Sequence, residues 1–268
     1  MPEYRHILSL SGGKDSTALA LYMRDKVPEM EYVFCDTGKE LPETYEYLSR
    51  VEAFLGKKIT VLNDRAGFDH WLKVFDGYLP APNMRWCTKL LKLKPFEYFV
   101  GDTPVISYIG LRADEDRTGL ISGKPNLKTV FPFKEDGINY ENVLRILEDS
   151  GIGLPPYWNW GRTNSGCYFC FFQKSYEWVR LLEVHPDLFD EAQKYEKFSD
   201  IPGKSFLWNQ EMSLAELRKP NNVQAIKNRF FARQATMKKN RKNKRLIEIF
   251  TDYEFDENEP QACLICQL

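Results

Sequence analysis

Short apolar runs alternate with segments of helical periodicity along the first half of the chain. The runs are rich in β-branched and aromatic residues and are bounded by glycine or polar residues, which is typical of strands. The segments between them carry apolar residues three or four positions apart, which is typical of helices. This alternation predicts an α/β fold with a doubly wound parallel sheet. Strands are expected at residues 6–8, 31–34, 58–62 and 105–109, and helices at residues 17–23, 43–55 and near 141–150.

The second part of the chain is predicted to be mainly helical. Apolar residues between 178 and 184 share one helical face, and His185-Pro186 interrupts that pattern before it resumes. Every ionisable residue between 226 and 245 is Lys or Arg, and an acidic stretch follows at 252–259. We therefore expect two domains, residues 1–175 and residues 176–268.

Composition narrows the functional classes. With 43% hydrophobic and 28% charged residues, the 268-residue chain has the make-up of a soluble globular protein. Its net charge of −1 gives no general affinity for nucleic acid, so such affinity would need a local basic patch. No run of 18 apolar residues and no signal-peptide pattern is present, so we expect a cytoplasmic protein with no membrane contact. In a reducing compartment, six cysteines predict ligands or reactive thiols rather than disulfides.

A glycine-rich turn directly follows the first predicted strand and precedes the first predicted helix. This order places backbone N–H groups and a positive helix end against an anion, and glycine lets a phosphate approach the backbone. The Walker spacing is absent, so the turn is not a P-loop. The expected phosphate-binding residues of the turn are Ser9, Ser11, Gly12, Gly13, Lys14, Asp15 and Ser16.

Two more predicted strands end in polar residues. Carboxyl ends of parallel strands share one edge of a sheet, where ligands collect. We therefore expect nucleotide contacts from the end of the second strand and from the loop after the strand at 105–109, whose arginine suits phosphate oxygens. These residues are Phe34, Asp36, Thr37 and Gly38, together with Gly110 and Arg112.

The cysteines fall into different settings. Cys167 and Cys170 form a Cys-x-x-Cys pair at a glycine turn, a spacing that suits zinc, an iron–sulfur cluster or a redox pair. Cys35 follows an apolar strand and is expected to be a buried small hydrophobe.

Lysines 89, 92 and 94 are expected to face solvent or phosphate. The three histidines lie outside the motifs and are expected to be structural.

Several motifs together carry a family resemblance. Ser11-Gly12-Gly13-Lys14-Asp15-Ser16 resembles the pyrophosphate loop (PP-loop) of the ATP pyrophosphatase superfamily, which splits ATP between its α and β phosphates. With the motifs at 36–44, 85–95, 110–115 and 166–170, it resembles the phosphoadenosine phosphosulfate (PAPS) reductase family over roughly residues 4–215. The resemblance implies an adenine nucleotide alpha hydrolase-like (HUP-type) fold.

The sequence departs from the true sulfonucleotide reductases. Their Glu-Cys-Gly-Leu-His motif is absent, and Cys87 lacks the tandem cysteine of the cluster-bearing reductases. The cysteine pattern more closely resembles the ATP-pyrophosphatase subunit of bacterial DNA phosphorothioation systems (Ssp-type or Dnd-type), and the short chain favours the Ssp type. This resemblance implies ATP, a DNA phosphate as acceptor, a cysteine desulfurase as sulfur donor, other DNA-modification subunits and a [4Fe–4S] cluster.

From these patterns we assign expected roles. Lys14, Asp15 and Arg112 are the catalytic candidates, and Asp15 or Asp36 is the candidate ligand of Mg²⁺. The resemblance makes Cys87, Cys167 and Cys170 the cluster ligands, with Cys263, Cys266 or an external sulfide as the fourth; zinc on the same residues is an alternative.

The basic stretch is the predicted DNA-backbone contact, through Lys238, Lys239, Arg241 and Lys242. The alternative is a solvated helix that pairs with the acidic stretch. Phe230 or Phe231 would either stack on bases or pack in the core. Whether the chain forms a homodimer is left open.

Three rival functions remain at this stage. A sulfonucleotide reductase with a relocated thiol at Cys263 or Cys266 would release sulfite from PAPS. An enzyme of the same superfamily would thiolate tRNA or a small metabolite. A non-catalytic nucleotide-binding subunit is a third possibility, although the intact Lys14 and Asp15 argue against it.

Overall fold

The structure is a computed structural model, and it describes residues 4–116, 124–198, 206–209 and 212–241. The described residues form two compact units. The first comprises residues 4–76 and 83–167, and the second comprises residues 77–82 and those from 168 onward. No described helix combines the length and the apolar character needed to cross a membrane.

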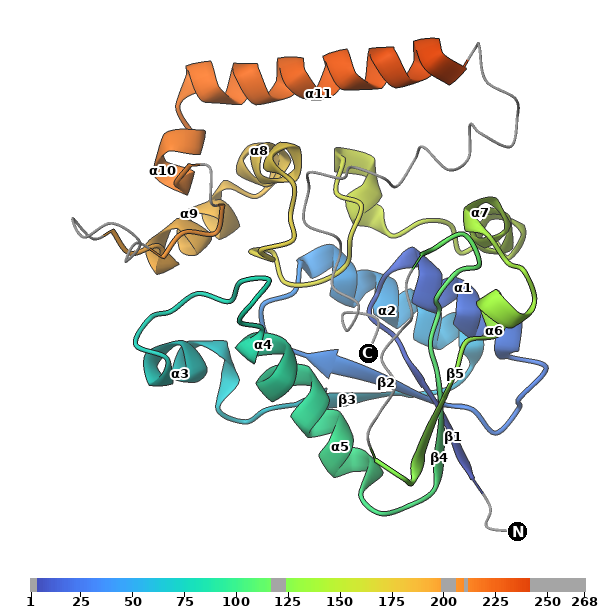
Figure 1. Cartoon of the computed structure of the whole chain (residues 1–268). Coiled ribbons are helices and arrows are strands. Elements are labelled where there is room, and N and C mark those ends of the chain that lie inside the picture. Colours follow the sequence, from blue (N-terminus) through green and yellow to red (C-terminus); the bar gives the residue numbers. More distant parts are fainter. Residues whose placement is uncertain (1–3, 117–123, 199–205, 210–211, 242–268) are drawn as a thin grey trace. The chain divides into compact units, whose positions relative to one another are not determined.

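The first unit is built on a five-stranded sheet in the order β3-β2-β1-β4-β5, in which every neighbouring pair is parallel (Figure 1). Four of the strands confirm the sequence prediction. The fifth was not predicted, because its short sequence Leu-Lys-Thr-Val carries little apolar signal. The strands are β1 (Arg5–Ser9), β2 (Glu31–Asp36), β3 (Ile59–Asn63), β4 (Val105–Tyr108) and β5 (Leu127–Val130).

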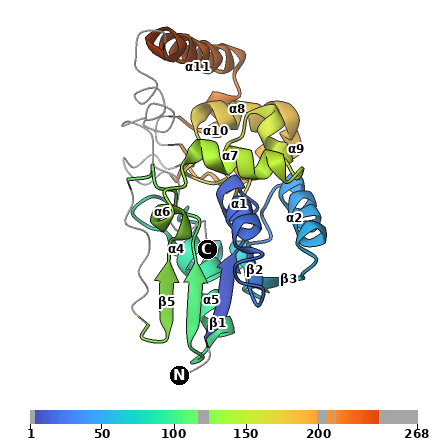
Figure 2. The same ribbon diagram turned by 90° about the vertical axis from the view of Figure 1, so that its right-hand side faces the viewer.

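Helices cover both faces of this sheet (Figure 2). Successive side chains of a strand point to opposite faces, so the buried strands serve two cores. Leu8 and Phe34 pack with α1, α2 and α7 on one face, whereas Ile7 and Val33 pack with α5 on the other. The doubly wound parallel α/β sheet is therefore confirmed. These helices are α1 (Lys14–Met23), α2 (Pro42–Leu55), α5 (Lys94–Val100) and α7 (Tyr140–Asp149).

The segment before α5 corrects one prediction. It continues through a π-helical turn, η1 (Lys89–Leu93), and in that turn Lys92 is only 7% exposed. Lys89 and Lys94 are exposed as expected, but Lys92 does not face solvent. The wider turn of a π-helix shifts the side chains by one position relative to α-helical spacing, which the sequence pattern does not reveal.

The second unit is mainly helical, as predicted for the C-terminal region. Trp178 on α8 and Phe189 on α9 are fully buried, and the Trp208 indole N–H donates to the Ala192 carbonyl over 2.8 Å. The four main helices here are α8 (Ser175–Val184), α9 (Pro186–Tyr195), α10 (Leu214–Leu217) and α11 (Pro220–Arg241).

Short helices complete the described chain. They are α3 (Gly67–Val74), α4 (Trp86–Thr88), α6 (Pro132–Glu135) and the 3-10 helix η2 (Pro156–Trp160).

Candidate active site: the glycine loop and the strand ends

The turn between β1 and α1, here called the glycine loop (residues 9–16), lies at the carboxyl end of the central strand. Gly12 has a positive φ of 72°, and a Cβ on it would lie 2.6 Å from Cγ2 of Thr44. A Cβ on Gly13 would lie 2.8 Å from Oγ of Ser165. Both positions therefore require glycine, because neighbouring side chains occupy the space that a Cβ would need.

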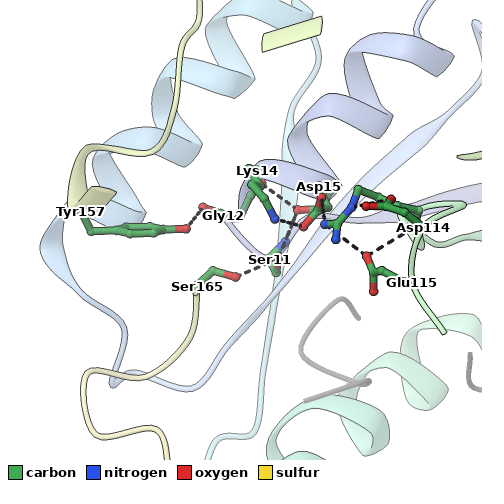
Figure 3. A network of polar contacts seen from close by, with 11 residues as sticks. Ser11, Gly12, Lys14, Asp15, Asp114, Glu115, Tyr157 and Ser165 are labelled. Atoms are coloured by element: carbon green, nitrogen blue, oxygen red, sulfur yellow. Dashed lines mark hydrogen bonds and ion pairs between the residues drawn. The ribbon is translucent and has the colours of Figure 1, made fainter. Parts of the chain in front are cut away.

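Hydroxyl groups converge on this loop (Figure 3). The Ser16 hydroxyl accepts the Ser11 backbone N–H over 3.2 Å and lies 3.1 Å from the Ser11 hydroxyl. Ser165, 154 residues further along the chain, donates its hydroxyl to that of Ser11 over 3.1 Å. Three hydroxyls thus form a chain beside the N-terminus of α1, where the helix dipole favours an anion.

The charged residues of the loop form one buried network. Asp15 lies 2.7 Å from Nζ of Lys14 and 2.8 Å from a guanidinium nitrogen of Arg112. Burial acts to raise the pKa of Asp15, but the charges and hydrogen bonds of Lys14 and Arg112 outweigh it and leave the pKa below its usual value. Asp15 is therefore a carboxylate at neutral pH.

Arg112 supports Asp15 from the end of β4. Its side chain is 1% exposed and also contacts Asp114 and Glu115, each over 3.2 Å (Figure 3). The strand end approaches α1 closely, since a Cβ on Gly110 would lie 2.9 Å from the Asp15 carbonyl oxygen. In this arrangement, the guanidinium group is held by three carboxylates, and its direct contact with a phosphate stays a prediction.

The end of β2 contributes a second group of predicted residues. Asp36 accepts the Gly38 backbone N–H over 2.8 Å and the Tyr45 hydroxyl over 2.7 Å. Phe34 is 4% exposed and packs edge-on against Tyr45. Ser9, at the end of β1, is also buried, at 2% exposed.

Cys167 is held at this strand end. Its thiol lies 3.1 Å from the Thr37 hydroxyl and 3.9 Å from a carboxylate oxygen of Glu40. The backbones of Glu40 and Cys167 form an antiparallel bridge. Cys167 therefore joins the β2 end, and Ser165 of the same segment joins the glycine loop.

The described residues do not assemble a metal site. Among them, no group of three His, Cys, Asp or Glu side chains is arranged to hold a metal ion. Cys87 and Cys167 belong to the first unit, Cys170 belongs to the second, and Cys263 and Cys266 lie outside the described residues. The cluster, zinc and Mg²⁺ therefore stay predictions.

The remaining cysteine is buried, as expected. Cys35 is 2% exposed and donates its thiol to the Lys92 carbonyl. Burial raises its pKa to about 11, so it is a thiol at neutral pH.

Sequence reasoning missed three residues in η2 and in the segment that leads from it to Cys167. Tyr157 is fully buried and donates its hydroxyl to the Gly12 carbonyl over 2.9 Å. The buried guanidinium of Arg162 donates to the carbonyls of Asn164, Gly166 and Cys167 and so fixes the loop that carries Ser165. The glycine, proline and aromatic content of this stretch predicted a loop, but nothing in it indicated a partner 145 residues earlier.

The predicted DNA-contacting residues lie on or beyond α11 in the second unit. Lys238, Lys239 and Arg241 are on this helix, and Lys242 lies outside the described residues, as does the acidic stretch. Phe230 stacks on Tyr176 with 3.6 Å between ring centroids, whereas Phe231 is 54% exposed. One phenylalanine packs and the other faces solvent.

Comparison with known proteins assigns the family. The model of the phosphoadenosine phosphosulfate reductase domain matches residues 5–170, which is more than half of the chain and includes the glycine loop, both strand ends and the Cys-x-x-Cys pair. The chain belongs to the PAPS reductase domain family. The match confirms the resemblance to the PAPS reductase family. It does not identify the molecule on which the protein acts.

Curated relatives of this PAPS reductase family member are longer proteins. An uncharacterized protein of Methanocaldococcus jannaschii is 27% identical over 198 residues, covering 68% of this chain and 45% of that protein. A second from the same organism is 35% identical over 113 residues, covering 41% and 23%. An uncharacterized nin region protein of Escherichia phage lambda is 29% identical over 154 residues, covering 46% and 52%. The chain thus spans about half or less of the length of these relatives.

Solved structures that align with part of this chain include two enzymes. A PAPS reductase from Candida auris, in a phosphate complex, aligns with a TM-score of 0.49 and 15% identity, over 62% of this chain and 82% of that one. The U34-tRNA thiolase NcsA from Methanococcus maripaludis, with its [4Fe-4S] cluster, aligns with a TM-score of 0.38 and 14% identity, over 72% and 71%.

Proposed function

We propose that this PAPS reductase family member is an ATP pyrophosphatase that adenylates a DNA backbone phosphate so that sulfur can replace one of its oxygens. The observation that carries the proposal is the glycine loop, which places two glycines, three hydroxyls and Lys14 at the N-terminus of α1. Such a site suits the β and γ phosphates of a nucleotide and leaves the α phosphorus for reaction.

The proposed reaction has two steps. A non-bridging oxygen of the DNA phosphate attacks the α phosphorus of ATP, and pyrophosphate leaves. A cysteine desulfurase supplies the sulfur as a persulfide, and a thiol reductant releases it as hydrosulfide while the two remaining sulfurs form a disulfide. The hydrosulfide then attacks the DNA phosphorus, and AMP leaves with the former DNA oxygen. Both steps depend on positioning and on charge neutralisation, which Lys14 and the N–H groups of the loop can supply. Asp15 and Arg112 hold the loop in shape.

The choice of DNA as acceptor rests on α11. No acidic residue occurs between Pro220 and Arg241, and both Arg229 and Phe231 are exposed on this helix. Cations on an extended helix neutralise phosphates without reading bases, and an exposed ring can stack on an unpaired base.

Pyrophosphate release from ATP tests the proposal. Purified protein supplied with ATP, DNA and a sulfur donor is expected to release pyrophosphate and AMP, and Lys14→Ala is expected to lower the rate about a hundredfold or more, since it removes the cation of the loop. Lys26→Ala, at an exposed site after the same helix, is the matched control and should leave the rate unchanged.

Two outcomes would contradict the proposal. Release of sulfite from PAPS without pyrophosphate release from ATP would favour a sulfonucleotide reductase, which the family assignment keeps as the second candidate. Absence of phosphorothioate linkages in the DNA of cells that carry the chain with its candidate partner genes would remove DNA as the acceptor.

A further inference from the structure

Two aromatic rings flank the lysine of the glycine loop. Nζ of Lys14 lies 5.2 Å from the ring centroid of Tyr140 and 5.9 Å from that of Trp158. Arg112 lies over the same tyrosine ring, with its guanidinium carbon 5.4 Å from the centroid. Sequence analysis assigned neither ring a role, yet both border the loop's main cation.

The indole N–H of Trp158 differs in its hydrogen bonding from that of the nearby Trp160. Its nitrogen is buried, and it has no hydrogen-bond partner among the residues that the structure describes. By contrast, the indole N–H of Trp160, two residues later, donates to a carboxylate oxygen of Glu43 over 2.9 Å. A buried donor without an acceptor destabilises the fold, so one that persists beside a binding loop points to an acceptor supplied from outside the chain.

The backbone on both sides of Trp158 is anchored to the glycine loop. Tyr157, its direct neighbour, donates its hydroxyl to the Gly12 carbonyl, and Ser165 donates to the Ser11 hydroxyl. Arg162 fixes the intervening turn through three carbonyls. The backbone that carries Trp158 is therefore held beside the glycine loop by several hydrogen bonds and not by one flexible contact.

We propose that the indole N–H of Trp158 donates a hydrogen bond to the terminal phosphates of the nucleotide, next to Lys14. The ligand class is a diphosphate group, whether within ATP or as free pyrophosphate, because its oxygens would accept from the indole while Lys14 balances their charge. The ring of Trp158 is only half-buried, so rotation about its side-chain torsions brings the N–H to such a ligand. This inference rests on the proposed nucleotide-binding role of the glycine loop.

The test compares two substitutions that each remove one indole N–H and keep an aromatic ring. Trp158→Phe is expected to weaken binding of ATP and of inorganic pyrophosphate about tenfold, measured by calorimetry, and to leave AMP binding unchanged. Its thermal unfolding midpoint should be unchanged or higher, because a donor without a partner is lost. Trp160→Phe is expected to lower that midpoint and to leave both affinities unchanged.

A second measurement does not depend on the variant's stability. In the unaltered protein, one of the six tryptophan indole N–H resonances is expected to shift downfield on addition of pyrophosphate and not on addition of AMP, and to be absent in Trp158→Phe. Unchanged pyrophosphate affinity in Trp158→Phe, or an equal loss for AMP, would overturn the inference.

The inference and the proposed function can fail separately. If the protein binds pyrophosphate through Trp158 but releases none from ATP with DNA, the proposed function is wrong and the ligand assignment stands. If pyrophosphate is released but Trp158→Phe binds it normally, only the ligand assignment is wrong.

Discussion

The carboxylate of Asp15 lies between two cations, so its ionisation contributes to folding as well as to the site. Its folded-state pKa is lower than the ordinary value of 3.8, because Lys14 and Arg112 more than offset the effect of burial. A carboxyl with a lowered pKa adds stability that is present above its unfolded pKa and is lost as the pH falls through the folded value.

Asp15→Asn should therefore destabilise the protein in a pH-dependent way. At pH 7 the loss is expected to be about 1–3 kcal/mol, since Lys14 and Arg112 each lose a charged partner. The difference from the unaltered protein should shrink below pH 3.8, where the aspartate takes up a proton. Urea unfolding at pH 7 and near pH 3 measures both values, and Asp25→Asn, at a position 85% exposed, is the control that should change neither. A pH-independent difference would contradict this account.

Some residues of the candidate site could be predicted from the sequence, and others could not. The structure brings Lys14, Asp15 and Arg112 into contact, and all three were candidates because glycine turns and strand ends carry local signals; their catalytic role stays a prediction. The three-carboxylate environment of Arg112 could not be foreseen, since Asp15 lies 97 residues away in the sequence. Tyr157 and Ser165 were missed for the same reason.

At the scale of elements, the glycine loop owes its shape to packing against α2. An alanine at position 12 would meet both a positive φ and the methyl group of Thr44. Gly56, which ends α2, has a similar φ of 63° but open space around its Cα. Comparing an alanine substitution at Gly12 with one at Gly56 therefore separates the cost of backbone strain from the cost of steric overlap.

Gly12→Ala is expected to cost about 2–5 kcal/mol of unfolding free energy, the sum of a left-handed backbone penalty and overpacking. Gly56→Ala should cost only the backbone part, about 1–2 kcal/mol. Adding Thr44→Ser to Gly12→Ala removes the methyl group and should recover part of the difference. Chemical denaturation of the four proteins provides the values; equal losses for the two alanine variants would show that the overlap relaxes freely.

Elements with strong periodicity were predictable, and those shaped by tertiary context were not. Strands β1 to β4 and helices α1, α2 and α7 follow their apolar patterns closely. Strand β5 has four residues and no clear apolar signal, so only its pairing with β4 defines it. The π-helical turn that buries Lys92 depends on packing that no local pattern records.

For the whole molecule, DNA affinity must come from a local patch, because the net charge is −1. Reversing Lys238, Lys239, Arg241 and Lys242 to glutamate is expected to weaken DNA binding at least a hundredfold at low salt. It should also flatten the dependence of log K on log salt by about three to four units, since four phosphate contacts are lost. Fluorescence anisotropy at several salt concentrations measures both effects.

A matched charge reversal controls for net charge alone. Lys58, Arg65, Lys73 and Lys128 are exposed in the first unit, and their reversal gives the same total charge. If both quadruple variants lose affinity equally, the basic stretch is not the DNA-binding surface.

The central position of β1 has a consequence for how the protein is made. This strand pairs with β2 nearby in sequence and with β4 a hundred residues later, and the glycine loop gains its last anchor only from Ser165. During translation, the loop leaves the ribosome before β4 and Ser165 and must wait for these distant partners, which is a slow route for a parallel sheet. The glycine loop is thus synthesised well before it can take its final shape, and a nascent chain that ends before Ser165 would contain the loop sequence without the scaffold that shapes it.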